Sequence, residues 1–161
     1  MRESISRISG GLAALIGSIV IAVPTQAHHS IAMYDGNKVQ VFTGVVTRVS
    51  PGSSHLVIFF GPLNEARDTV LRDEAGEPII WSLELTGAGQ AAREGISVNT
   101  FPPGTIFSAG LHPLRSGDPG GVREGAIFKC PENTPPPAGA HCDSVAGSTP
   151  HGRGELPKAN E

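Results

Sequence analysis

The sequence predicts an all-β protein, a small five-stranded Greek-key barrel of the OB-like type with one short helix and a disordered C-terminal tail. Several short segments alternate between apolar and polar residues or run continuously apolar, which is typical of strands. The 161 residues include 21 Gly and 14 Pro, and long helical patterns are absent, as in a turn-rich β protein. Several short strands with one helix late in the order favour a small Greek-key barrel. A small β-sandwich is the alternative.

The first two strands are expected at residues 39–49 and 55–60. In the first, valines recur at every second position and give the strand one strongly apolar face. Gly44 interrupts this run, where we expect a bulge or a sharp coil. The second strand is continuously apolar and ends at the Gly-Pro pair of residues 61–62. Residues 50–54, which are rich in Ser, Pro and Gly, form the loop between the two strands.

A hairpin and a helix are expected in the middle of the chain. Residues 69–73 and 78–86 flank a Glu-Ala-Gly-Glu segment that reads as a hairpin turn. Within the second arm, Trp81 belongs to the apolar face and is expected in the core, with a ligand-stacking platform as the alternative. Residues 89–94 can form one or two helical turns, which Gly95 would end.

The last two strands of the barrel are expected at residues 105–112 and 122–130. The segment between them, residues 115–121, contains three glycines and a proline and reads as a mobile connection. Residues 28–130 therefore form the predicted β-barrel domain. Residues 131–161 form a Pro/Gly-rich tail, which we expect to be disordered from Gly147 onward.

The chain begins with a segment that reads as a secretory signal peptide, residues 1–27. Arg2 and Arg7 supply the positive start, residues 11–23 supply a short apolar run, and small residues follow it. This run is too short for a stable membrane span, which needs roughly 20 residues, so we expect no span after processing. The predicted location is periplasmic or secreted.

Two cysteines, Cys130 and Cys142, occur in the chain. Disulfides persist in the oxidising compartments that an exported protein reaches, so we expect a bridge that closes a proline-rich loop. A metal site formed by the two cysteines with His141 and His151 is the alternative, but the spacing matches no zinc pattern. Otherwise these two histidines are expected to be solvated.

The candidate metal site depends on where the signal peptide is cut. Cleavage after residue 27 would make His28 the first residue, with His29 beside it. A free amine and imidazole nitrogens form a ligand set that suits copper(II). The terminal amine and ring of His28 would form a chelate, and His29, His55 or His112 would add a further imidazole. Copper is therefore the predicted cofactor, and the predicted metal ligands are His28, His29, His55 and His112.

Three further side chains are relevant to this site. Met33 offers a soft thioether for copper(I), and Asp35 could orient an imidazole from the second coordination shell. Glu84 lies on the strand face opposite Trp81, and if partly buried we expect it to form an ion pair with Arg48 or Arg93.

Composition excludes several function classes. The chain carries 12 Lys and Arg against 15 Asp and Glu, a net charge of −3, and no basic patch, so nucleic acid is not an expected partner. The sequence contains neither a nucleophile elbow nor a dinucleotide-binding fingerprint, and no catalytic residues are predicted. Copper-dependent oxidation is the enzymatic alternative. A metal-free cell-envelope module that binds a small ligand or a protein partner is the non-enzymatic one.

A set of short motifs resembles a known family. They are Ala-His-His-Ser at 27–30, Ile-Ala-Met-Tyr-Asp at 31–35, Lys38, Thr-Gly-Val-Val at 43–46, Trp81 with Glu84, and Pro113 with Arg115. Over roughly residues 24–128 the chain is similar to a bacterial exported family catalogued as domain of unknown function 6152. The resemblance implies a small exported β domain and no established activity. Members usually carry Asn-Pro-His at the end of the first strand; here a longer Gly/Ser loop replaces the Asn-Pro pair and His55 retains the histidine.

Overall fold

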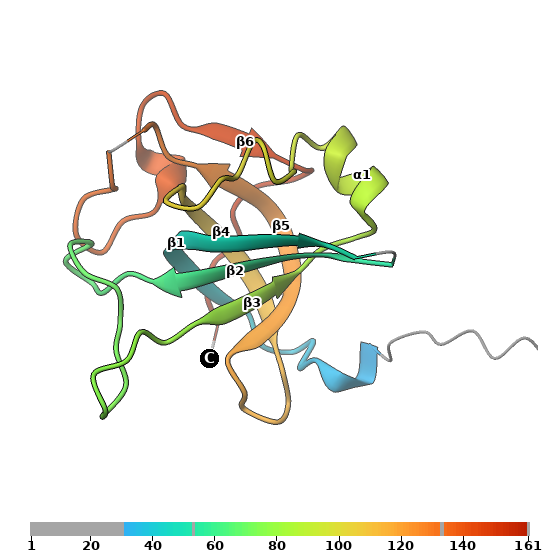
Figure 1. The fold of residues 1–161 in the computed structure, drawn as a ribbon, viewed down its shortest axis with the longest axis horizontal. Coiled ribbons are helices and arrows are strands. Elements are labelled where there is room, and N and C mark those ends of the chain that lie inside the picture. The colour runs from blue at the N-terminus through green and yellow to red at the C-terminus, as the bar shows by residue number, and fades with distance from the viewer. Residues whose placement is uncertain (1–30, 53, 133, 161) are drawn as a thin grey trace, which may run out of the picture.

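The computed structural model describes residues 31–52, 54–132 and 134–160, in which five strands close into a barrel (Figure 1). The strands follow the order β3-β2-β1-β4-β5, and a parallel pairing of β3 with β5 closes the sheet. Their bounds are β1 Gln40–Pro51, β2 Leu56–Pro62, β3 Trp81–Glu84, β4 Ile106–Pro113 and β5 Gly120–Lys129. The predicted all-β barrel with one short α-helix is confirmed.

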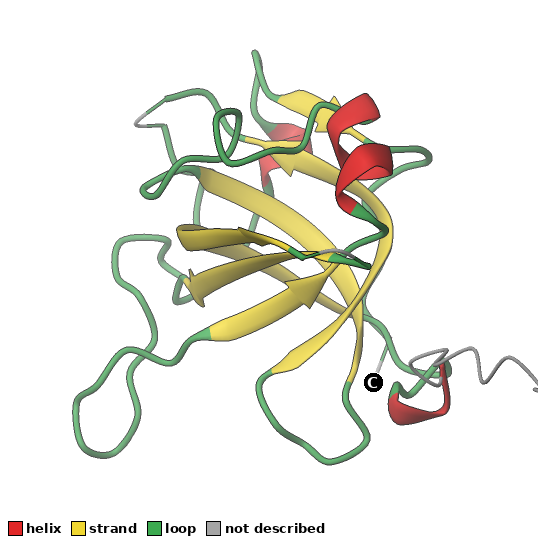
Figure 2. Cartoon of the chain, turned by 45° about the vertical axis from the view of Figure 1, so that its right-hand side comes forward, coloured by secondary structure: helices red, strands yellow, loops and turns green. Residues whose placement is uncertain are grey.

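Short helices and a sixth strand surround this barrel. Figure 2 shows α1 at the upper end, and η1 with the loop between β4 and β5 at the lower end. No helix in the described part of the chain is long and apolar enough to cross a bilayer. The bounds are η1 Ile31–Met33, α1 Ala88–Arg93, η2 Cys142–Ser144 and β6 Thr149–His151.

Aromatic rings occupy the centre of the barrel. Phe107 lies edge-on to Phe60 with ring centroids 5.2 Å apart and to Phe101 at 6.2 Å. All three side chains are buried: Phe60 and Phe107 occupy strand positions that point into the barrel, and Phe101 enters it from the segment between α1 and β4. Leucines and isoleucines from β2, β3, β4 and β5 fill the space around them.

Gly44 allows β1 to approach β2 closely, whereas the bulge lies elsewhere. The register between the two strands shifts between Val46 and Arg48. At Gly44 a Cβ atom would lie 2.5 Å from Cδ2 of Phe60, so the glycine makes room for that ring. The expected irregularity is therefore displaced by a few residues, and the reason for this glycine is packing.

Substituting Gly44 tests this reading. Gly44→Ala is expected to lower the free energy of unfolding by about 1–3 kcal/mol, because the added methyl group overpacks the core. Gly36→Ala is the matched control, since a Cβ there meets nothing within 4 Å, and a change below about 0.5 kcal/mol is expected. Urea unfolding measures both changes; equal stability of the two variants would contradict the packing role of Gly44.

The predicted hairpin in the middle of the chain is mostly irregular. Its turn is present, with the amide of Gly76 donating to the carbonyl of Asp73 at 3.0 Å. The two arms meet only through a bridge between Arg72 and Pro78, and β3 begins three residues later. A two-stranded ribbon that leaves the barrel has no core to support it, and proline lacks the amide hydrogen a ladder needs. The expected strand at residues 69–73 is therefore wrong.

The expected disorder of the tail is also wrong for the residues that the structure describes. β6 pairs with the end of β5, and Val39 and Asn160 exchange backbone hydrogen bonds of 3.3 and 2.9 Å. A disulfide joins Cys130 to Cys142, as predicted. The tail lacks a core of its own, but it gains order from the barrel edge and the cross-link.

His141 and His151 are half-buried rather than solvated. His141 Nδ1 lies 2.9 Å from Oγ1 of Thr43, and burial lowers the pKa of this imidazole. The ring of His151 packs edge-on against Phe101 with centroids 4.9 Å apart, and burial lowers its pKa as well. Both histidines thus fasten the tail to the barrel.

Candidate functional site

The four predicted metal ligands differ in what the structure shows of them. His28 and His29 lie outside the described residues. His55 precedes β2, and His112 lies near the end of β4. Within residues 31–52, 54–132 and 134–160, no group of three or more His, Cys, Asp or Glu side chains is arranged to hold a metal. A complete metal site would therefore require the N-terminal residues.

His112 has the contacts of a structural histidine. Its Nδ1 lies 2.7 Å from the carbonyl oxygen of Lys38 and its Nε2 lies 3.2 Å from Oε2 of Glu124. Both partners are hydrogen-bond acceptors, so each ring nitrogen already faces a group of the protein. This arrangement joins β4 to β5 and to the segment before β1, and favours a structural role over a ligand role.

His55 belongs to a network that the sequence did not predict. Glu84 of β3 accepts a hydrogen bond from the Tyr34 hydroxyl at 2.9 Å through Oε2. Its Oε1 lies 3.3 Å from Nδ1 of His55. The same ring nitrogen lies 3.1 Å from the carbonyl oxygen of Leu85. We call these three side chains the Tyr34–Glu84–His55 network.

The network raises the pKa of Tyr34 and favours one tautomer of His55. Tyr34 is only 7% exposed, and burial, with the hydrogen bond and charge of Glu84, raises the pKa of its phenol to about 12. The neutral hydroxyl is therefore held as a donor to Glu84. For His55, two acceptors at Nδ1 favour the tautomer with its proton there, which places the lone pair of a neutral ring on Nε2.

The expected ion pairs of Glu84 are wrong. The guanidinium of Arg48 lies 4.0 Å above the centre of the Phe59 ring, and Arg93 donates to the side chain of Gln90 within α1. Glu84 instead meets Tyr34, which lies 50 residues earlier in the chain, and His55, which directly precedes the neighbouring strand β2. No local pattern could have indicated these pairings.

Met33 and Asp35 were also considered near the metal site. Met33 is 43% exposed at the end of η1. Asp35 accepts a hydrogen bond from the amide of Asn37 at 3.3 Å and lies 3.7 Å from Nη1 of Arg115. Asp35 therefore stabilises the turn before β1 and its contact with the loop after β4.

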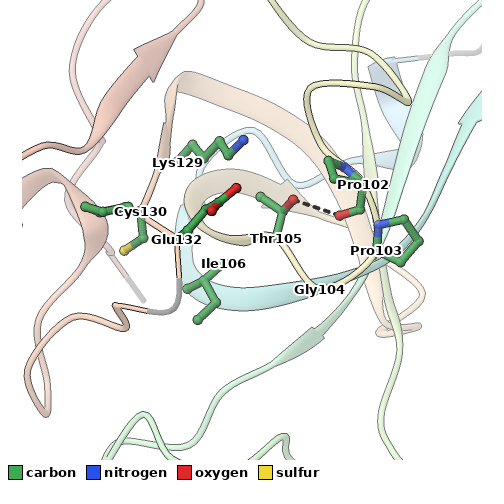
Figure 3. A pocket seen from close by; sticks show the side chains of 9 residues that line it. Pro102, Pro103, Gly104, Thr105, Ile106, Lys129, Cys130 and Glu132 are labelled. Carbon is green, nitrogen blue, oxygen red and sulfur yellow. Dashed lines mark hydrogen bonds between the residues drawn. The ribbon is translucent and has the colours of Figure 1, made fainter.

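One cavity, of about 270 Å³, lies beside the disulfide, and Figure 3 shows its lining. Its polar groups are largely engaged within the protein. Thr105 donates its hydroxyl hydrogen to the carbonyl of Pro102 at 2.7 Å, and Lys129 donates to the carbonyl of Thr100 at 2.9 Å. Since no aromatic side chain lines this cavity, it offers few features for recognising a ligand.

A second cavity, of about 230 Å³, lies at the end of the barrel where β1, β3 and β5 begin and β4 ends. We call it the mouth cavity. Trp81 packs against the core, as predicted, and also lines this cavity. Its lining residues are Asp35, Lys38, Gln40, Trp81, Pro113, Leu114, Arg115, Gly117 and Asp118.

Comparisons with known proteins identify a family but no activity. No curated protein and no solved structure matches the chain. One family model, described as a family of unknown function (DUF6152), matches residues 17–123. The match spans more than half of the chain and includes the Tyr34–Glu84–His55 network and the strands that carry it. The protein therefore belongs to the family of unknown function DUF6152.

Proposed function

We propose that this protein is exported and binds copper(II) through its processed N-terminal histidines, with His55 completing the site. The Tyr34–Glu84–His55 network carries the proposal. Histidines that bind metals commonly donate one ring N–H to a carboxylate or a backbone carbonyl, which orients the ring and raises its basicity. Both kinds of acceptor lie at Nδ1 of His55. This is the support that a ligating Nε2 would require.

The same network fastens the chain close to the N-terminal histidines. Tyr34 follows His28 by six residues; three of them form η1 and rise about 2 Å each, and the others can extend to about 3.6 Å each, so the segment spans at most about 17 Å. The hydroxyl of Tyr34 is bound to the carboxylate that contacts His55. This tether is long enough for His28 and His55 to act on one ion.

The donor set suits copper(II) better than other common divalent ions. An amine and imidazole rings are nitrogen ligands, which favour tetragonal copper(II), and copper leads the usual affinity order. The disulfide supports the export part of the proposal, because such bonds persist in oxidising compartments. Intact mass spectrometry of the exported protein is expected to show a chain that starts at His28; a start at another residue would contradict the chelate.

The copper proposal is tested by calorimetric titration of the chain that starts at His28. His28→Ala, and separately acetylation of the terminal amine, are each expected to weaken copper(II) binding by at least about tenfold, because the first removes the ring and the second the amine of the chelate. His55→Ala is expected to weaken binding by about tenfold or more. Affinity is expected to fall toward acid pH, since the amine and the imidazoles must lose protons to bind.

His112→Ala is the matched control for these variants. It removes an imidazole whose two nitrogens face Lys38 and Glu124, so copper binding is expected to match that of the unchanged chain. Copper binding by His28→Ala and His55→Ala that is as strong as binding by the unchanged chain would contradict the proposal. Electron paramagnetic resonance of the copper-loaded chain supplies a second readout, because loss of a nitrogen ligand changes the spectrum.

A further inference from the structure

The mouth cavity contains a polar atom that the fold leaves unsatisfied. Oε1 of Gln40 is buried and has no hydrogen-bond partner among the described residues. Gln40 lines the mouth cavity, and it shares a strand face with Phe42, which packs against the core. A buried acceptor without a donor costs free energy, so native proteins seldom keep one without a reason.

The surroundings of this atom combine an apolar ring with balanced charges. Trp81 lines the cavity, and its ring lies 4.5 Å from that of Phe42. The charged residues comprise two acids and two bases, and one pair of them, Asp35 and Arg115, forms an ion pair of 3.7 Å. The cavity therefore has hydrogen-bond donors and acceptors but no excess of either charge.

We propose that the mouth cavity binds a neutral, polyhydroxylated ring, the chemistry of a sugar residue. A hydroxyl group can donate to Gln40 Oε1 or to a carboxylate, and it can accept from an ammonium or a guanidinium. The C–H face of such a ring can pack on Trp81. With about 230 Å³, the cavity is smaller than the usual drug-sized pocket of about 300–1,000 Å³, so it suits one ring rather than a chain of rings.

This site is separate from the proposed copper site, and neither depends on the other. Gln40 and Trp81 begin β1 and β3, whereas Glu84 ends β3 and His55 precedes β2. Titrations with sugars are therefore run in the presence of EDTA, which removes copper. A failure of copper binding then leaves the sugar result intact, and the reverse also holds.

Fluorescence of Trp81 tests the sugar proposal directly, because Trp81 is the one tryptophan of the chain. The probes are glucose and N-acetylglucosamine, their β-1,4-linked disaccharides cellobiose and chitobiose, and the charged solutes glycine betaine and citrate. At least one neutral sugar is expected to give a saturable change at millimolar concentration. A stronger response to a disaccharide identifies a chain end as the source; an equal response identifies a free monosaccharide, and both results support the site.

Gln40→Met separates binding from folding. It keeps the approximate volume of the side chain and removes the acceptor, so sugar binding is expected to weaken at least tenfold while the urea midpoint stays equal or rises. Gln90→Met makes the same chemical change in α1, outside the mouth cavity, and is expected to bind sugar as the unchanged chain does. Three results would overturn the proposal: no saturable change with any of the four sugars, a response only to the charged solutes, or full sugar binding by Gln40→Met.

Discussion

Replacing Cys130 and Cys142 together with alanine is expected to lower the free energy of unfolding by about 3 kcal/mol. The bond closes a short loop, with the two residues 12 apart in sequence, and loss of a cross-link of this span releases about that much chain entropy in the unfolded state. Both sulfur-bearing residues are buried, so alanine adds no polar group to the interior. Urea unfolding at neutral pH measures the change.

The same variant is expected to loosen the tail before the barrel unfolds. The amide of Cys142 donates to Oγ of Ser108 at 2.9 Å, and His141 contacts Thr43 beside it. These contacts remain possible without the disulfide, but the loop that brings them into place is then free to open. Limited proteolysis is expected to cut the variant between residues 131 and 141 first. The reduced unchanged protein is the control, and a variant within about 0.5 kcal/mol of the oxidised chain would contradict the prediction.

Tyr34→Phe is expected to remove a specific loss of stability at alkaline pH. In the folded protein the pKa of Tyr34 is raised to about 12, whereas an unfolded tyrosine titrates near 10. A raised folded pKa means that this group stabilises the fold fully below pH 10, and that the contribution is lost as the pH rises to about 12. At about 1.4 kcal/mol for each pH unit, the loss amounts to about 2–3 kcal/mol.

Spectroscopy can follow this group alone, because Tyr34 is the one tyrosine of the chain. Tyrosinate absorbance is expected to rise with a midpoint near 12 in the folded protein and near 10 in urea. At neutral pH the phenylalanine variant is expected to be less stable by about 1 kcal/mol, since Glu84 loses a hydrogen-bond donor. A folded-state midpoint near 10 would show that the Tyr34–Glu84 contact is absent in solution.

Local periodicity was sufficient to predict most of the barrel. The alternating valines of β1 and the apolar run of β2 identify strands because side chains on a strand alternate between the two faces. The helix and the disulfide also follow from short-range signals, the glycine after α1 and the even cysteine pair. These predictions succeeded because each depends on residues that lie close together in the sequence.

The hairpin arm at residues 69–73 and the tail failed for opposite reasons. The arm has a strand-like sequence, but it extends away from the barrel, and its pairing is limited to single bridges of Val70 with Leu63 and of Arg72 with Pro78. The tail has the composition of a disordered segment, yet β5 offers it an edge and Asn160 returns to Val39. In both cases the partners available for pairing, and not the local sequence preference, decided whether a strand formed.

The candidate sites show the same division. By itself, the sequence determined which residues carry ligand chemistry, because histidine, glutamate and tryptophan keep their donor atoms and rings in any fold. Only the tertiary structure decided that Glu84 would meet Tyr34 and His55 rather than an arginine, and that the side-chain oxygen of Gln40 would be buried without a hydrogen-bond partner among the described residues. The physical reason is that both facts depend on strand register across the closed barrel, which couples residues far apart in the chain and leaves no periodic signal in any one segment.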